Sequence, residues 1–96
     1  MQFVISAIDK PNSLALRMAT RQAHFEYAQK GDTLKLGGPY LDANGDMIGS
    51  LIIIEAADLE AARRWHAGDP YVKAGLFASS DVRPWKATAN RCDAKL

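Results

Sequence analysis

The segment from Met47 to Glu55 constrains the fold most strongly, because both of its alternating sets of side chains are mainly apolar. One set contains Ile48, Ser50, Ile52 and Ile54, and the other contains Leu51 and Ile53. The chain has only two stretches suited to substantial helices, and two helices cover one face of a sheet. The second face is expected to be buried by another chain or to form the wall of a cavity, and we therefore expect a homodimer.

The order of the predicted elements indicates an α+β fold. Strands are expected over residues 2–8, 33–42, 47–55 and 77–86, and helices over residues 13–30 and 58–68. The first strand is apolar on both faces, which is typical of a central strand, whereas Pro39 indicates a kink or an edge and Pro84 an edge. With right-handed crossovers, this order predicts a ferredoxin-like βαββαβ fold, in which a four-stranded antiparallel sheet carries two helices on one face.

Length, charge and cysteine content limit the domain organisation and the partners. The chain has 96 residues, enough for one domain, which we place at residues 1–86 with a polar tail at 87–96. The net charge of +1 gives little electrostatic support for binding nucleic acid. No stretch approaches the ~20 apolar residues of a membrane span, and the first residues lack the pattern of a secretory signal. The single cysteine, Cys92, excludes an internal disulfide, so we expect a cytoplasmic protein.

The first predicted helix carries three polar side chains within or beside its apolar stripe. At 100° per residue, this stripe contains Leu14, Met18, Phe25 and Ala28. Arg21 falls inside the stripe, and Arg17 and His24 fall on its edge. Burying an arginine is costly unless it pairs or reaches water. These residues either pack their stems on the core and extend their polar ends to solvent, or they line a cleft.

Three other polar residues each have two interpretations. Asp69 precedes Pro70, which favours an extended backbone, and it is expected to cap a short turn over residues 70–75, to take part in chemistry, or both. The Ser50 hydroxyl either bonds within the sheet or contacts a ligand. His66 has no evident partner and is expected either to pack or to serve a ligand or a proton transfer.

The chain resembles the YciI-like, or YCII-related, family over nearly its whole length up to Lys86. The matching residues are Asp9-Lys10, Arg17, Arg21-x-x-His24, Gly38-Pro39, Gly49-Ser50, Leu59-Glu60-Ala61-Ala62, Trp65 and Asp69-Pro70-Tyr71-Val72-x-Ala74-Gly75. The resemblance implies a dimeric α+β barrel and an active site centred on a histidine and an aspartate, at the positions of His24 and Asp69. Most members of this family have no assigned reaction, and some relatives act on substituted aromatic compounds, including by dehydrochlorination.

These observations leave three hypotheses about function. A small-molecule enzyme of lyase, isomerase or hydrolase type would use His24 and Asp69 for proton transfer and Arg17 and Arg21 to hold an anionic group. No nucleophilic serine or cysteine accompanies the pair, so covalent catalysis is not indicated. A binding module would use the same pocket for a metabolite without turnover. An interaction domain would use its apolar sheet face only for dimerisation and would have no enclosed polar cavity around His24.

The position of Asp69 relative to His24 is the open question in the enzyme hypothesis. The two helices of this topology run antiparallel, so the end of the second lies closer to the start of the first. Asp69 is therefore expected nearer to the start of the first helix than to His24. Two alternatives follow: Asp69 pairs with Arg17 or Arg21 and forms the electrostatic frame of a pocket, or it contacts His24 and takes part in proton transfer.

We expect no metal and no cofactor. Asp42, Asn44 and Asp46 have the spacing of part of a calcium loop. The glycine of such a loop is misplaced here, however, and no glutamate stands at the closing position.

Overall fold

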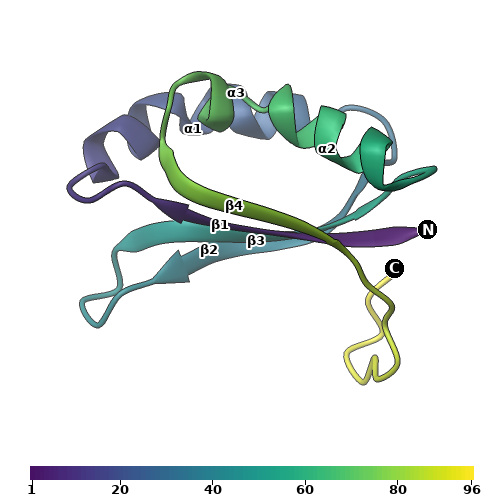
Figure 1. Cartoon of the computed structure of the whole chain (residues 1–96). Coiled ribbons are helices and arrows are strands. Elements are labelled where there is room, and N and C mark those ends of the chain that lie inside the picture. Colours follow the sequence, from purple (N-terminus) through teal and green to yellow (C-terminus); the bar gives the residue numbers. More distant parts are fainter.

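The computed structural model describes all 96 residues and contains one antiparallel sheet covered by helices. The elements are β1 (Gln2–Asp9), α1 (Leu14–Ala28), β2 (Leu34–Leu41), β3 (Met47–Glu55), α2 (Leu59–Ala67), α3 (Pro70–Lys73) and β4 (Phe77–Pro84). The helices all lie on one face of the sheet (Figure 1). The predicted ferredoxin-like fold is therefore confirmed. Besides the two expected helices there is a third, α3, which follows α2 and lies within the turn predicted over residues 70–75.

The sheet has the strand order β2-β3-β1-β4, so β1 is central and β2 and β4 are the edges, as predicted. The Gly37-Gly38-Pro39 segment does not break β2. Instead, the register between β2 and β3 shifts on either side of it, between Leu34 and Leu36 and between Tyr40 and Leu41. Because β2 is an edge strand, the N–H that Pro39 lacks is not needed for a hydrogen bond to a further strand.

The hydrophobic core lies between the helices and the two central strands. Phe3 and Ile5 of β1 stand opposite Ile54 and Ile52 of β3, and all four are buried against Ala62 of α2. Burying such side chains contributes about 1.5–3 kcal/mol each. This core fixes α2 on the sheet and thereby positions the α2–α3 junction that carries Asp69.

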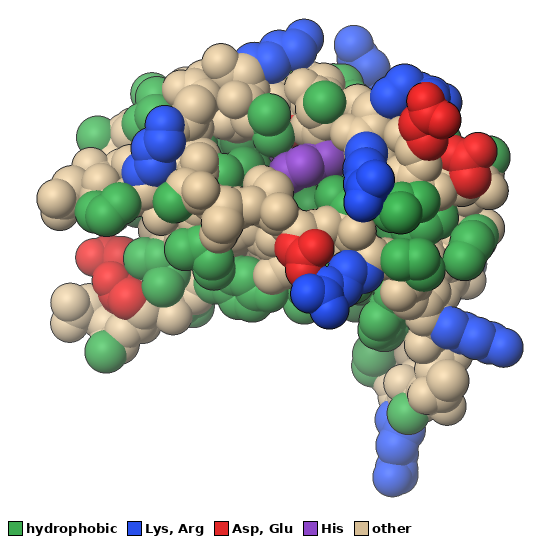
Figure 2. Space-filling model, viewed as in Figure 1, with side chains coloured by type: hydrophobic (Ala, Val, Ile, Leu, Met, Phe, Trp, Pro, Cys, Tyr) green, Lys and Arg blue, Asp and Glu red, His purple; other side chains and the backbone are tan.

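The opposite face of the sheet carries no helix (Figure 1). Ile8, Leu36 and Leu51 on this face are 44%, 50% and 40% exposed. In Figure 2, hydrophobic side chains lie along the lower border of the molecule, beneath the sheet. The strand that is apolar on both faces thus has one face covered by helices and one face open.

Residues 85–96 form no helix or strand, and they extend below the sheet, on the side away from the helices (Figure 1). None of the helices combines the length and the hydropathy that crossing a membrane requires.

The orientation of α1 differs from the predicted apolar stripe. The side chains that α1 buries are Arg17, His24 and Ala28. Met18 and Phe25 are 49% and 40% exposed instead. The reason is that the two buried polar side chains find strong partners inside the protein, described below, and this offsets the cost of removing them from water.

Candidate functional site

A cavity of ≈ 280 Å³ lies between α1, α3 and the β2–β3 half of the sheet. Its lining includes Arg17, Arg21, His24, Phe25, Ser50 and Tyr71. Four of the five predicted site residues therefore reach one cavity, and the fifth, Asp69, lies directly behind His24.

His24 and Asp69 form a direct hydrogen bond. Nδ1 of His24 lies 2.9 Å from each carboxylate oxygen of Asp69, and Asp69 is completely buried. A carboxylate only accepts, so this hydrogen bond places a proton on Nδ1, and in the neutral form of the imidazole Nε2 then has the free lone pair. Of the two alternatives for Asp69, the pairing with Arg17 or Arg21 is therefore wrong. It failed because α2 ends at Gly68 and the chain turns at once into α3, which packs on α1 and places Asp69 over His24.

The backbone around Asp69 holds the carboxylate in place. Asp69 is extended, with φ −64° and ψ 130°, as expected for a residue before proline. Its Oδ1 accepts the backbone N–H of Tyr71 at 2.9 Å and so caps α3. The capping role and the bond to His24 therefore belong to the same carboxylate.

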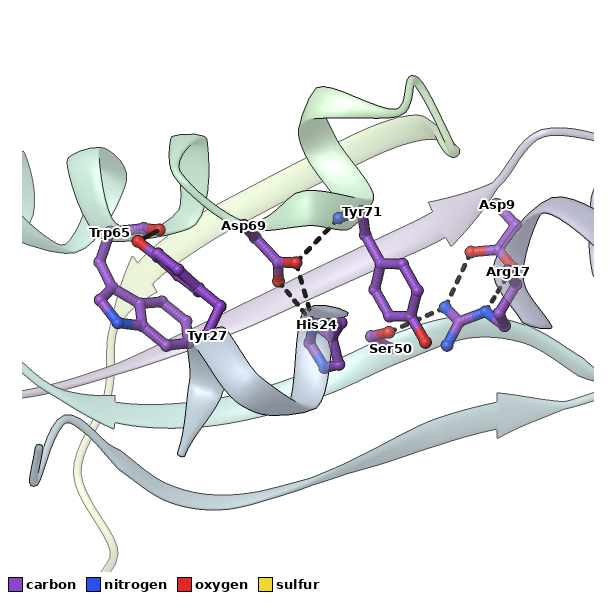
Figure 3. A network of polar contacts seen from close by, with 8 residues as sticks. All are labelled: Asp9, Arg17, His24, Tyr27, Ser50, Trp65, Asp69 and Tyr71. Carbon is purple, nitrogen blue, oxygen red and sulfur yellow. Dashed lines mark hydrogen bonds and ion pairs between the residues drawn. The ribbon is translucent and has the colours of Figure 1, made fainter. Parts of the chain in front are cut away.

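Arg17 is buried in a second polar cluster (Figure 3). Its Nε and Nη2 donate to the two oxygens of Asp9 at 2.7 and 2.9 Å, and Nη2 also donates to the Ser50 hydroxyl at 2.8 Å. Burial lowers the pKa of Arg17, but the hydrogen bond and charge of Asp9, together with the interactions of Tyr71, outweigh burial, so the pKa of Arg17 is raised. The Ser50 hydroxyl of β3 thus accepts a hydrogen bond from Arg17 of α1, and both residues line the cavity.

Tyr71 connects the two clusters, and the sequence interpretation assigned it no role. Its ring stacks on the His24 imidazole with the centroids 4.1 Å apart, and the Arg17 guanidinium lies 4.7 Å from the ring centroid. Figure 3 shows the Tyr71 ring between His24 and Arg17. Burial raises the pKa of Tyr71, although the charges of Arg17 and Arg21 oppose the shift. The position of Tyr71, two residues after Asp69, was the available signal, because capping of α3 brings the backbone N–H of Tyr71 to the Asp69 carboxylate.

Arg21 belongs to neither cluster. Its guanidinium lies 4.8 Å from the centroid of the Phe25 ring, and it forms no ion pair within the chain. Arg21 is exposed and lines the cavity, so it places an uncompensated positive charge at the rim.

His66 lies outside this cavity. It is 7% exposed, neither ring nitrogen has a hydrogen-bond partner, and its ring stacks on Phe77 with the centroids 5.8 Å apart. Burial lowers the pKa of His66, and the charge of Asp69 opposes that shift. The burial of His66 and its contact with Phe77 fit the interpretation of His66 as a packed side chain better than a role in ligand binding or proton transfer.

No group of three or more His, Cys, Asp or Glu side chains is placed to hold a metal ion. The polar side chains that line the cavity carry instead an imidazole, two guanidinium groups, two hydroxyl groups and the carboxamide of Gln29. These are suited to proton transfer and to binding an anion.

Comparisons with known proteins give one family. The YCII-related domain matches residues 1–86. Protein YciI of Escherichia coli O6:H1 is 39% identical over 95 residues, which cover 90% of this chain and 97% of that protein. An uncharacterised protein of Haemophilus influenzae is 37% identical with the same coverage.

The solved structures agree in fold. One is 5-chloro-2-hydroxyhydroquinone dehydrochlorinase (TftG) from Burkholderia phenoliruptrix AC1100, in complex with 2,5-dihydroxybenzoquinone. It is 37% identical, has a TM-score of 0.84, and the match covers 90% of this chain and 94% of that one. An antibiotic biosynthesis monooxygenase, 16% identical with a TM-score of 0.58, covers 93% of this chain and 100% of its own, and shares the fold of dimeric α+β barrel protomers. By its family match and by these identities, the chain belongs to the YCII-related family.

Proposed function

We propose that this protein is a small-molecule enzyme of lyase type that works by proton transfer at His24. The observation that supports this most strongly is the pair of 2.9 Å distances from His24 Nδ1 to the Asp69 carboxylate, combined with an imidazole that lines the cavity. In this arrangement Nε2 faces the ligand as a base, and Asp69 fixes the ring and stabilises the imidazolium that forms.

The substrate class follows from the size and the lining of the cavity. A volume of ≈ 280 Å³ is at the lower end of the ~300–1,000 Å³ typical of ligand pockets, which suits a compound with one ring. The exposed ring of Phe25 offers an apolar contact surface, and Arg21 offers a positive charge at the rim. TftG, with 37% identity, was solved with a dihydroxybenzoquinone. We therefore propose a hydroxylated, anionic ring compound as the ligand.

The open sheet face supports a homodimer as the working form. Its exposed side chains Ile8, Leu36 and Leu51 are apolar, and apolar patches of this kind typically mark protein interfaces. A second copy placed face to face would bury them, as in the dimeric barrels to which this fold class belongs.

Turnover of 5-chloro-2-hydroxyhydroquinone by His24→Ala and Asp69→Asn variants tests the proposed function. We expect wild-type protein to release chloride, His24→Ala to lose about 10²–10⁴ in kcat, and Asp69→Asn to lose activity in the same direction. Asp58→Asn is the matched control, because asparagine caps α2 about as well as aspartate and Asp58 lies outside the cavity.

The result also separates the enzyme from the alternatives. Loss of turnover with unchanged ligand affinity supports proton transfer at His24. Loss of affinity without any measurable turnover in the wild type contradicts the enzyme and favours a binding module.

A further inference from the structure

We propose that Tyr27 is a positioning residue, which holds the end of α2 against α1 so that the Asp69 carboxylate stays on the His24 imidazole. Tyr27 does not line the cavity, so it acts on the ligand only through this pair. The inference rests on the proposed function in that it explains how the same base is kept in place. It adds a residue that lies outside the cavity.

The first observation is a second attachment beside the His24–Asp69 bond. The Tyr27 hydroxyl donates to the Trp65 carbonyl oxygen at 2.7 Å, and this is the one hydrogen bond between α1 and α2 themselves. Tyr27 follows His24 by three residues, which places the two side chains on the same face of α1. Trp65 precedes Asp69 by four residues. The two bonds are therefore neighbouring attachments of one junction, and Figure 3 shows both.

The second observation is the space that Gly68 leaves for Tyr27. A side-chain carbon at Gly68 would lie 2.5 Å from the Tyr27 hydroxyl oxygen and 3.1 Å from Cζ of the ring. The backbone of Gly68 has a φ of −81°, which any residue adopts, so the glycine is needed here for space and not for conformation. Tyr27 thus packs on the residue directly before Asp69 as well as bonding to Trp65.

The third observation concerns the strength of this attachment. Burial raises the pKa of Tyr27, and the charge of Asp69 raises it further, so the hydroxyl keeps its proton and remains a donor. The Trp65 carbonyl oxygen also accepts the backbone N–H of Gly68 at 3.2 Å. One carbonyl oxygen therefore ties Tyr27 to the C-terminal end of α2.

The consequence is that Tyr27 controls the geometry of the base more than the fold. Ala62 in the middle of α2 is buried in the core on the sheet, whereas the last turn of the helix is tied to α1 through Tyr27. Asp69 follows this turn after one residue, so movement of the turn is passed directly to the carboxylate. A displacement of ~1 Å in a catalytic group can cost about 10² in rate.

Solvent exchange of the His24 Nδ1 proton tests the proposal without any substrate. This proton exchanges through openings that separate the imidazole from Asp69. We expect Tyr27→Phe to speed this exchange about fivefold relative to the backbone amides of β1 and β3, the effect of losing one hydrogen bond of ordinary strength. The strand amides report opening of the core, so this ratio removes any general loss of stability. The variant is expected to fold because it keeps the ring that packs on Trp65.

Tyr40→Phe is the matched control. The Tyr40 hydroxyl is also partly buried and hydrogen-bonded, to Ser6 at 2.8 Å, but it lies in the sheet and should leave the Nδ1 exchange ratio unchanged. Gly68→Ala is the complementary variant, because it keeps Tyr27 and displaces its hydroxyl from Trp65. It should speed the exchange in the wild type and by a smaller factor in Tyr27→Phe, where the hydroxyl oxygen that it would strike is missing.

Three results would overturn the proposal: an exchange ratio in Tyr27→Phe equal to that of the wild type, an equal increase in Tyr40→Phe, or independent, multiplying effects of Tyr27→Phe and Gly68→Ala. A wild-type protein without turnover would contradict the proposed function and would leave the exchange result readable. With turnover, Tyr27→Phe is expected to lower kcat at unchanged KM, because Tyr27 does not touch the ligand. A change in KM alone would also contradict the positioning role.

Discussion

At the scale of single residues, the site depends on polar side chains that are buried because they are paired. Arg17 and Asp69 are 3% and 0% exposed, and each is held by more than one hydrogen bond. Breaking a buried ion pair leaves an uncompensated charge, whereas losing an exposed pair leaves two solvated groups. The same substitution therefore has different consequences at the two kinds of site.

Asp9→Asn is expected to lower the free energy of unfolding by about 3 kcal/mol, because the Arg17 guanidinium loses its buried counter-ion. Glu60→Gln removes the exposed pair with Arg64 and is expected to cost less than about 0.5 kcal/mol. Urea unfolding of the two variants beside the wild type measures both values. Similar losses in the two variants would contradict the assignment of Arg17 as a buried, paired cation.

His66 is expected to make the protein less stable as pH falls. Burial lowers the pKa of His66 in the folded chain, so the unfolded chain binds the proton first as pH falls through ~6.5. Below that pH, the free energy of unfolding falls by up to about 1.4 kcal/mol per pH unit until the folded chain also protonates. Above it, His66 contributes no pH dependence.

The matched variant for this effect is His66→Leu, which removes the titrating group and the two nitrogens that lack partners. Thermal unfolding between about pH 5 and 7 should give a flatter dependence for this variant than for the wild type. Parallel curves for the two proteins would show that His66 is not the titrating group.

At the scale of elements, the sequence was sufficient for the strands and helices but not for the rotation of α1. Alternation and turn residues predicted every strand to within a few residues, because those signals are local. The buried face of α1 depends on Asp9 and Asp69, which lie outside the helix. Periodicity alone counts Arg17 and His24 as polar, and it cannot include partners that arrive only through tertiary folding.

The close contact of β3 with β1 gives a prediction at Gly49. A side-chain carbon there would overlap the Ala7 carbonyl oxygen and would lie 2.9 Å from the Tyr40 ring, whereas one at Gly38 would meet nothing within 4 Å. Gly49→Ala should therefore reduce the free energy of unfolding by about 1–3 kcal/mol, and Gly38→Ala should change it much less. Equal effects in denaturant titrations would show that β3 and β1 lie farther apart than described.

At the scale of the whole molecule, the site is made by the topology. Arg17 and His24 come from α1, Ser50 from β3, and Asp69 and Tyr71 from the α2–α3 junction. The resemblance to the YCII-related family implied His24 and Asp69 as a pair. The order of the helices alone suggested that His24 and Asp69 would lie apart. That inference failed because the local sequence does not indicate where the four-residue helix α3 packs on α1.

The homodimer is the prediction that belongs to this scale. Sedimentation velocity at micromolar concentration is expected to show a dimer for the wild type and a monomer for Leu51→Glu, because a charge on the open sheet face would be buried unpaired. Leu16→Glu, on the helical side of the molecule and 38% exposed, should remain dimeric. A monomeric wild type would contradict the dimer.

The protonation of the His24 imidazole tests the central claim most directly, and it requires no substrate. A two-dimensional ¹H–¹⁵N correlation spectrum of the ring, recorded at mildly alkaline pH without ligand, identifies which nitrogen carries the proton. We predict a proton on Nδ1, held by Asp69, and an unprotonated Nε2, with this preference lost in Asp69→Asn. A proton on Nε2 in the wild type would contradict the account, because His24 would then present no base to the cavity.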